Sequence, residues 1–561
     1  MTNLLRHRST RAALAAACVG ALGLTLAAAP ATAKPGPPQR GPITQSLTAV
    51  PEVEGPVAES GSSHMWSTMD RARVPLDLAE RGYVEEEFFL SGTANVYDNA
   101  GGELSVVTKD VPYVNNILVR RPAKKSDSSG VVLVDILNAS NGFPGEDHWR
   151  RMWDWAMEEG HTVIGVTSKP IQVDALKNFD AERYADLTWD VEDVEREPIV
   201  ADPANPGSFN PFMVVPGAEE GLAWDILTQV GTLLDSKEGR EVLGGQKAKT
   251  VLLMGQSQSG VYLNTYASNF HEAATEANRG PVFDGYLNTV GAVLERPLRQ
   301  AEKDGFVTVP GSEPGLDVPF ITVTSEGDAG LFGAATLAEK DLPDNRRHWQ
   351  VPSTPHTDLL STVIPADEEI YQAGRLPNTQ VKDPAFREAL NPYPLEPTII
   401  AAAESLVSWA KKGHEAAPSQ WFDQAGGALV RDEHGNVTGG VRYGLIEHPL
   451  GRYLGAAAPG AVYGSADLIS AEEFARTYGT REAYLELIAE FDAGQIEAGY
   501  LTEWGAEYFQ GVANTLLDRI GVPASADDDA AGTPPGHDGT PPGHGGTAPG
   551  HGGTAPGQAK K

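Results

Sequence analysis

Cysteine is almost absent from this 561-residue chain, which contains a single one, Cys18, inside an N-terminal apolar run. The rest of the chain therefore has neither a disulfide nor a thiol nucleophile. Basic residues are also scarce, since 43 Lys and Arg face 76 Asp and Glu for a formal net charge of −33. So acidic a surface repels phosphate backbones and anionic lipid head groups, and we expect neither a nucleic-acid partner nor stable membrane association.

The N-terminus has the three parts of a secretory signal peptide. It begins MTNLLRHRSTR, continues with an apolar run over 12–29 and ends in Ala31-Thr32-Ala33. This pattern predicts a signal peptide over 1–33, cleaved after Ala33, and a secreted, extracellular protein. A transmembrane anchor is the alternative, but the run is rich in Ala and Gly and a Pro/Gly-rich stretch follows it at once.

Composition divides the remainder of the chain into three parts. We expect a flexible N-terminal segment over 34–75, one enlarged domain over 76–523, and a disordered tail over 524–561. The tail carries four copies of a seven-residue Gly/Pro/His unit from Gly532 and too few apolar side chains to offset the entropy of ordering. Its repeated His537, His544 and His551 suggest metal binding, but a solvated tail is the simpler interpretation, and no metal or organic cofactor is expected.

The body of the chain predicts an α/β fold with a mostly parallel sheet flanked by helices. We expect strands over 83–97 and 111–120, with a hairpin as one arrangement of the two, and over 130–137, 161–167, 249–254, 319–324 and 348–351. Helices are expected over 148–160, 217–235 and 261–278, with a long loop region over 171–220. Ligands of such sheets bind at the C-terminal ends of the parallel strands.

A serine follows the strand 249–254 in the sequence Gly255-Gln256-Ser257-Gln258-Ser259-Gly260. A nucleophilic serine on a sharp strand-to-helix turn needs small residues two positions before and after it, and Ser257 has Gly255 and Ser259 there. Ser259 is the competing nucleophile, but the valine two positions after it is too bulky. The sequence therefore predicts Ser257 as the nucleophile, with the Gln258 amide directed at a developing oxyanion.

A serine nucleophile needs a histidine base oriented by a carboxylate, in the chain order serine, acid, histidine. Asp328 and Glu326 both follow the strand 319–324, and Asp328 is favoured with Glu326 as the alternative acid. His356 follows the strand 348–351 in the loop STPHTD and is the predicted base. The other downstream histidines include His348, inside that strand, and His434, in a turn.

A second oxyanion donor is expected in the loop after the strand 130–137. A backbone amide near Asn138 or Ala139 is the candidate, and an ordinary Asn/Ser/Gly turn is the alternative. Aromatic side chains of the long loop, Trp189, Phe209 and Phe212, are candidates for lining an acyl or aryl site.

These residues and several longer segments resemble the α/β-hydrolase superfamily and, more narrowly, the poorly characterised group of large "alpha/beta hydrolase domain" proteins. The segments include GYVEEEFFLSGTANVY (82–97), VVLVDILN (131–138), GQSQSG (255–260), SEGD (325–328), RHWQVPSTPHTD (347–358) and GNVTGGVRYGLIEHPLGRYLG (435–455). The resemblance implies the α/β-hydrolase fold and a triad of Ser257, His356 and either Asp328 or Glu326. It also implies that 360–523 is a helical extension or cap of the same globule, and it supplies no substrate.

The sequence thus predicts a secreted serine hydrolase that cleaves carboxylic esters through an acyl-enzyme intermediate. Its substrate is expected to be a small-molecule or polymer ester. An amidase or peptidase that uses the same triad, and an inactive hydrolase fold that acts as an extracellular binding protein, are the alternatives. The oligomeric state is left open.

Overall fold

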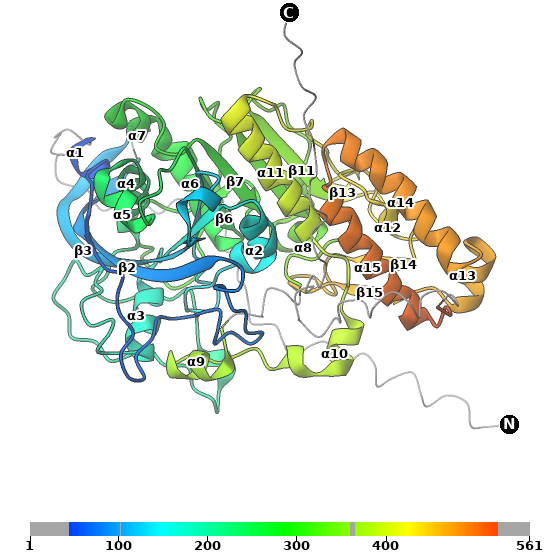
Figure 1. Ribbon diagram of the computed structural model, residues 1–561, viewed down its shortest axis with the longest axis horizontal. Helices are drawn as coiled ribbons and strands as arrows, with labels where there is room; N and C mark the ends of the chain where they lie inside the picture. The colour runs from blue at the N-terminus through cyan, green and yellow to red at the C-terminus, as the bar shows by residue number, and fades with distance from the viewer. Residues whose placement is uncertain (1–43, 101, 359–364, 525–561) are drawn as a thin grey trace, which may run out of the picture.

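The computed structural model of the chain describes residues 44–100, 102–358 and 365–524 (Figure 1). The predicted signal peptide over 1–33 lies outside the described residues, and so does the repeat tail apart from its first residue.

A nine-stranded sheet organises the fold, in the order β1-β2-β3-β5-β4-β6-β7-β10-β11. In chain order the strands are β1 (Glu52–Glu54), β2 (Tyr83–Asp98), β3 (Ser105–Pro122), β4 (Val131–Ile136), β5 (Thr162–Val166), β6 (Thr250–Gln256), β7 (Gly285–Thr289), β10 (Phe320–Ser325) and β11 (Arg346–Val351). Pairing is antiparallel from β1 to β5 and parallel from β5 through β4, β6, β7 and β10 to β11. The C-terminal ends of these parallel strands therefore share one edge of the sheet.

The parallel strands are buried on both faces, and their residues alternate between two cores. In β4, Val132 and Val134 face one core, while Val131 and Leu133 face the other. Such near-continuous apolar runs are typical of strands that helices cover on both sides. The mostly parallel sheet flanked by helices is the predicted α/β fold.

Each core has its own helices. Packed with the first are α3 (Pro170–Phe179), α4 (Ala223–Asp235), α5 (Lys237–Val242), α6 (Gln258–Asn269) and α7 (His271–Asn278). The second is built with α2 (Trp149–Glu158), α11 (Glu396–Lys412), α12 (Gly444–Glu447), α13 (Ala471–Thr477), α14 (Arg481–Ala498) and α15 (Glu503–Ile520). Figure 1 shows α14 and α15 side by side at the end of the molecule opposite β2 and β3. The expected helical C-terminal part is present and packs on the sheet through α11.

Short elements complete the described chain. These are α1 (Thr44–Leu47), α8 (Glu326–Phe332), α9 (Asp367–Gln372), α10 (Pro384–Ala389) and the two-stranded pairs β8 (Leu294–Glu295) with β9 (Val309–Pro310), β12 (Gln424–Ala425) with β13 (Ala428–Leu429), and β14 (Gly451–Leu454) with β15 (Ser465–Leu468). None of the helices within the described ranges is long and apolar enough to cross a membrane.

Three local predictions differ from the structure. The start of the expected loop 171–220 is the helix α3, which begins with Pro170 at a position where the missing N–H costs nothing. The expected helix 261–278 begins at Gln258 and is divided at Phe270 into α6 and α7. Strand β7, which lies between β6 and β10, was not expected, because apolar and polar residues do not alternate clearly enough in its sequence GYLNT to predict a strand.

The described part of the segment expected to be flexible, 44–75 of 34–75, contains a paired strand and several buried side chains. Strand β1 pairs with β2, and Leu47, Met65 and Trp66 are buried. Trp66 also donates from Nε1 to the Pro144 carbonyl, 3.1 Å away. Burying these large apolar side chains offsets the entropy of ordering the segment.

The outer edge of the sheet, at β11, is covered by a segment from the C-terminal half. Gln420 donates its amide to the His348 carbonyl at 2.9 Å and accepts from the Gln350 amide at 3.1 Å. The Gln350 carbonyl in turn accepts from the Val441 amide at 2.7 Å. Backbone groups of an edge strand are thus paired within the chain.

Candidate active site

Ser257 occupies a sharp turn between β6 and α6. Its φ of 55° and ψ of −118° lie in a region that residues with a side chain rarely adopt. A hydrogen bond of 2.8 Å from its amide to the Thr289 carbonyl holds the turn to β7. A Cβ at Gly255 would lie 2.3 Å from the Ser259 carbonyl oxygen, so the turn requires glycine there. The local sequence and the sheet together project the Ser257 hydroxyl from the C-terminal edge.

His356 lies against this hydroxyl. Its Nε2 is 2.8 Å from Ser257 Oγ, and its Nδ1 is 2.5 Å from Asp328 Oδ1. An ionised carboxylate only accepts hydrogen bonds, which assigns the proton to Nδ1 and leaves Nε2 to accept from the serine hydroxyl. Three predicted residues that are far apart in sequence thus meet at the C-terminal edge of β6, β10 and β11.

Asp328 is fixed by the first turn of α8. It is fully buried, and its Oδ2 accepts a hydrogen bond of 2.9 Å from the Ser325 amide. A Cβ at Gly327 would lie 2.4 Å from the backbone nitrogen of His356, so the backbones of this turn and of the histidine loop are in contact. The acid and the base are positioned by the same contact.

Glu326, the alternative acid, faces other partners. Its Oε2 accepts from the Ser353 amide at 2.9 Å, and its Oε1 accepts from Arg431 Nη2 at 2.8 Å. The Gly455 amide donates to the same Oε1 at 3.3 Å. Glu326 therefore links the strand end to a C-terminal segment, and Asp328 is the carboxylate that contacts His356.

The backbone amides predicted as oxyanion donors have different hydrogen-bond partners in the structure. The Asn138 amide donates to the Gly145 carbonyl at 2.8 Å, so it is already engaged and is not a free donor. The Ala139 amide donates to the side-chain Oε1 of Gln258 at 3.2 Å, so a side chain, not the backbone, accepts its hydrogen bond. The Gln258 amide belongs to the first turn of α6, where backbone N–H groups have no intrahelical acceptor. Ala139 and Gln258 remain the candidate oxyanion donors, the first bonded to a side chain and the second at the helix start next to Ser257.

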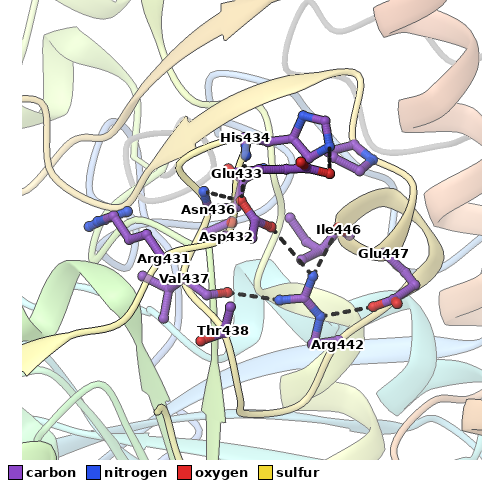
Figure 2. Close-up of polar contacts among 12 residues, drawn as sticks. Arg431, Asp432, Glu433, His434, Asn436, Val437, Thr438, Arg442, Ile446 and Glu447 are labelled. Carbon is purple, nitrogen blue, oxygen red and sulfur yellow. Dashed lines mark hydrogen bonds and ion pairs between the residues drawn. The ribbon is translucent and has the colours of Figure 1, made fainter. Parts of the chain in front are cut away.

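The other downstream histidines are placed elsewhere. His348 is buried inside β11, with Nε2 2.6 Å from Thr324 Oγ1, and burial lowers its pKa to about 3. His434 is half-exposed in the turn of the 431–447 segment (Figure 2). Neither is positioned next to Ser257.

Figure 2 shows how that 431–447 segment holds its shape. The Asp432 carboxylate accepts from the amides of His434 and Asn436 at 3.0 and 2.9 Å. The Arg442 guanidinium donates to the Val437 carbonyl at 2.8 Å and to Glu447 at 3.0 Å. This internal framework presents Arg431, at the start of the segment, to Glu326.

A fully buried guanidinium supports the histidine loop from behind. Arg151 of α2 contacts Asp358, two residues after His356, through Nη1 at 2.7 Å and Nη2 at 3.2 Å. It also contacts Glu396 of α11, whose pKa is raised by burial. The Thr357 amide donates to the Val462 carbonyl at 2.9 Å. Sequence reasoning missed Arg151, because its distance along the chain from His356 gives no signal.

Apolar side chains gather next to the serine and the histidine. Val261, one helical turn after Ser257, belongs to a buried cluster with Ala292, Leu294 and Phe306, against which Phe212 and Phe332 pack. Phe332 also meets the His356 ring edge-on, with centroids 6.0 Å apart.

The three candidate aromatic side chains of the long loop lie in different places in the structure. Phe212 is part of this apolar cluster. The predicted Trp189 instead lies in the core, with Nε1 bonded to Asn115 Oδ1, and Phe209 packs on Arg375. Only one of the three candidates thus lies beside the serine.

The fold, the strained serine turn and the order of the three side chains are those of an α/β hydrolase. A family model described as "Alpha/beta hydrolase domain" matches residues 53–510. The chain belongs to this alpha/beta hydrolase domain family. A comparison with curated proteins found no match.

Solved structures similar to the chain are distant. The esterase Est22 is 12% identical over 61% of this chain and 83% of its own, with a TM-score of 0.28. The poly(3-hydroxybutyrate) depolymerase LpqC from Bordetella parapertussis is 13% identical over 48% and 88%, with a TM-score of 0.24. The rice cell wall degrading esterase LipA from Xanthomonas oryzae is 10% identical over 38% of this chain, with a TM-score of 0.21. The chain spans less than half, 44%, of the length of that esterase.

Proposed function

We propose that the protein is a secreted serine hydrolase that cleaves carboxylic esters. The observation that carries the proposal is the hydrogen-bonded series from Ser257 Oγ through the His356 ring to Asp328, at 2.8 and 2.5 Å, on a strained strand-to-helix turn. A backbone conformation of this kind costs about 1–3 kcal/mol, and it persists at sites where it contributes to mechanism.

In the proposed reaction Ser257 Oγ bonds to the ester carbonyl carbon while its proton passes to His356 Nε2. The amides of Gln258 and Ala139 stabilise the oxyanion that develops, and Asp328 stabilises the imidazolium. The bond to the alcohol oxygen then breaks, and the alcohol leaves with the proton from His356. Water repeats the sequence on the acyl-enzyme: its proton goes to His356, its oxygen bonds to the carbonyl carbon, and Ser257 leaves reprotonated with release of the acid.

The apolar cluster of Val261, Ala292, Leu294, Phe306, Phe212 and Phe332 supports an ester with an apolar portion near the scissile bond. No step draws on a metal or an organic cofactor, because the serine, the base and the amides supply each proton and charge.

Ser257→Ala tests the proposal, with Ser259→Ala as the matched control in the same turn. The wild type and the control should be labelled by a fluorophosphonate and should hydrolyse short p-nitrophenyl esters. Ser257→Ala should lose labelling and about 10⁴-fold or more in kcat. Labelling that survives in Ser257→Ala contradicts the proposal. Turnover of peptide anilides without turnover of esters would assign an amidase, and absence of both labelling and turnover in the wild type would favour a binding protein.

Export is tested separately, by N-terminal sequencing of the protein from culture medium. A mature chain that begins at Lys34 is expected, since the small-x-small pattern ends at Ala33.

A further inference from the structure

Lys169 is a buried cation at the C-terminal edge of the sheet. It follows β5 and immediately precedes the first residue of α3, and it is 4% exposed. Its Nζ lies 3.9 Å from the centre of the Tyr262 ring, and no oxygen of the described residues accepts a hydrogen bond from it. A cation over an aromatic ring gains less free energy than an ammonium loses when it leaves water. Burial accordingly lowers the pKa of Lys169 well below its usual range.

The charges around Lys169 leave it without a counter-ion of its own. Glu220 is the carboxylate whose charge reaches it. However, Glu220 Oε1 already accepts from Arg296 Nη2 at 2.7 Å and Nε at 3.2 Å. Arg296 itself lies 5.9 Å from the centre of the Tyr262 ring. When Lys169 is protonated, this group of Lys169, Arg296 and Glu220 carries a single net positive charge.

The group lies beside the proposed oxyanion donors. Ser168, the neighbour of Lys169, donates from Oγ to the Leu137 carbonyl at 2.8 Å, two residues before Ala139. Tyr262 lies one helical turn after Gln258 on the same face of α6. The five positions from Ser257 to Tyr262 correspond to about 7.5 Å along the helix axis. A short extended chain starting at Ser257 spans that distance.

The overlying loop connects both sides of this region. Met213 packs with Ala139 and Ile171, whereas its neighbour Phe212 packs with Val261 and Phe306. Both side chains are only partly buried. The segment of Phe212 and Met213 therefore borders both the side of Ala139 and the side of Val261.

We propose that Lys169 binds a carboxylate of the substrate, so that the preferred esters carry one negative charge a short chain away from the scissile carbonyl. Half-esters of linear diacids are the simplest members of this class. A single carboxylate matches the single net charge of the group, whereas Glu220 and the acidic surface disfavour a dianion. The inference depends on the proposed function, because it identifies the substrate class of the same serine.

Binding to the inactive Ser257→Ala protein tests the inference without turnover. The probes are monomethyl adipate and its neutral counterpart methyl 6-amino-6-oxohexanoate, compared by titration calorimetry. The carboxylate should bind about tenfold or more tightly than the amide, and adding Lys169→Met should remove that difference. Lys177→Met, a partly buried lysine near the other end of α3, is the control that should retain it. Lys169→Arg, which restores the charge, should recover part of the preference.

Several results would overturn the inference. Equal binding of the two probes does so if it holds across half-esters of about four to ten carbons, which cover the estimated span. A preference that survives Lys169→Met also does so. Folding of Lys169→Met is judged by fluorophosphonate labelling of the variant that retains Ser257. If that labelling is lost, Lys169→Gln replaces Lys169→Met, and its preference for the carboxylate probe is compared with that of the wild type. Ser257-dependent hydrolysis of p-nitrophenyl acetate without any preference for a carboxylate contradicts this inference and leaves the proposed function standing. Absence of all ester turnover contradicts the proposed function.

Discussion

At the level of single residues, the two acids of one short turn, Asp328 and Glu326, have different partners and different roles. Asp328 is bonded to the His356 ring, and Glu326 is bonded to the Ser353 amide and to Arg431. A carboxylate that orients the imidazole stabilises charge in the transition state, whereas one that links two loops acts on stability.

Substituting the two acids separately should therefore give opposite patterns. Asp328→Asn should lower kcat on a p-nitrophenyl ester about 10³–10⁴-fold with little change in KM, because the amide favours the wrong tautomer. Glu326→Gln should retain much more activity and lose about 1–3 kcal/mol of unfolding free energy. Steady-state kinetics and urea unfolding of both variants measure the two effects. The assignment fails if Glu326→Gln loses the larger share of kcat.

The sequence specifies the nucleophile better than the acid, for a physical reason. Ser257 is defined by contacts within six residues, since Gly255 and Ser259 meet across the turn. Asp328 and Glu326 are two positions apart, and the choice between them depends on Arg431, which is about a hundred residues away. The sequence likewise gives no sign that the Asn138 amide, a predicted oxyanion donor, pairs with the Gly145 carbonyl across a loop.

At the level of elements, the buried strands and amphipathic helices followed the sequence patterns most closely. The hairpin of β2 and β3 and the strands β4, β5, β6, β10 and β11 are confirmed, because long apolar runs have few alternatives to burial. The helix α3 and the strand β7 escaped prediction, since both acquire their burial from neighbouring elements. Their own residue patterns are mixed.

Arg151 shows how elements distant in sequence hold the base loop. It is 4% exposed and contacts Asp358 after His356 and Glu396 on α11. Replacing it by Met removes the cation that contacts the buried Glu396 and the partly buried Asp358, at a cost of about 3–5 kcal/mol. Urea unfolding should detect this loss together with a lower kcat. Arg476→Met, which removes an exposed pair with Glu473, should cost less than about 1 kcal/mol. Similar losses for the two variants would argue against the support role of Arg151.

At the level of the whole molecule, buried acids make stability depend on pH. Glu369 on α9 is buried, and this burial raises its pKa to about 7, from an ordinary value of 4.5. The folded state then keeps a proton that the unfolded state releases near pH 4.5. The stability from this proton is therefore present below pH 4.5 and is lost as the pH rises through about 7.

Glu369→Gln should reveal this dependence, because the amide stays neutral. Relative to the wild type, the variant should gain about 2 kcal/mol of unfolding free energy between pH 5 and pH 8. Glu368→Gln, at the exposed neighbouring position, should show no such trend. Urea titrations at intervals over this range measure the difference, and a flat difference for Glu369→Gln would contradict the effect.

The C-terminal segments that cover β11 and hold the histidine loop are synthesised after the three residues of the predicted triad. During synthesis the ribosome delivers Ser257, Asp328 and His356 before the residues that fasten them, Arg431 and Val462. The nascent chain thus contains the complete chemistry for about a hundred residues of translation before the base loop is held. Hydrolytic competence should consequently appear only after synthesis has passed Val462.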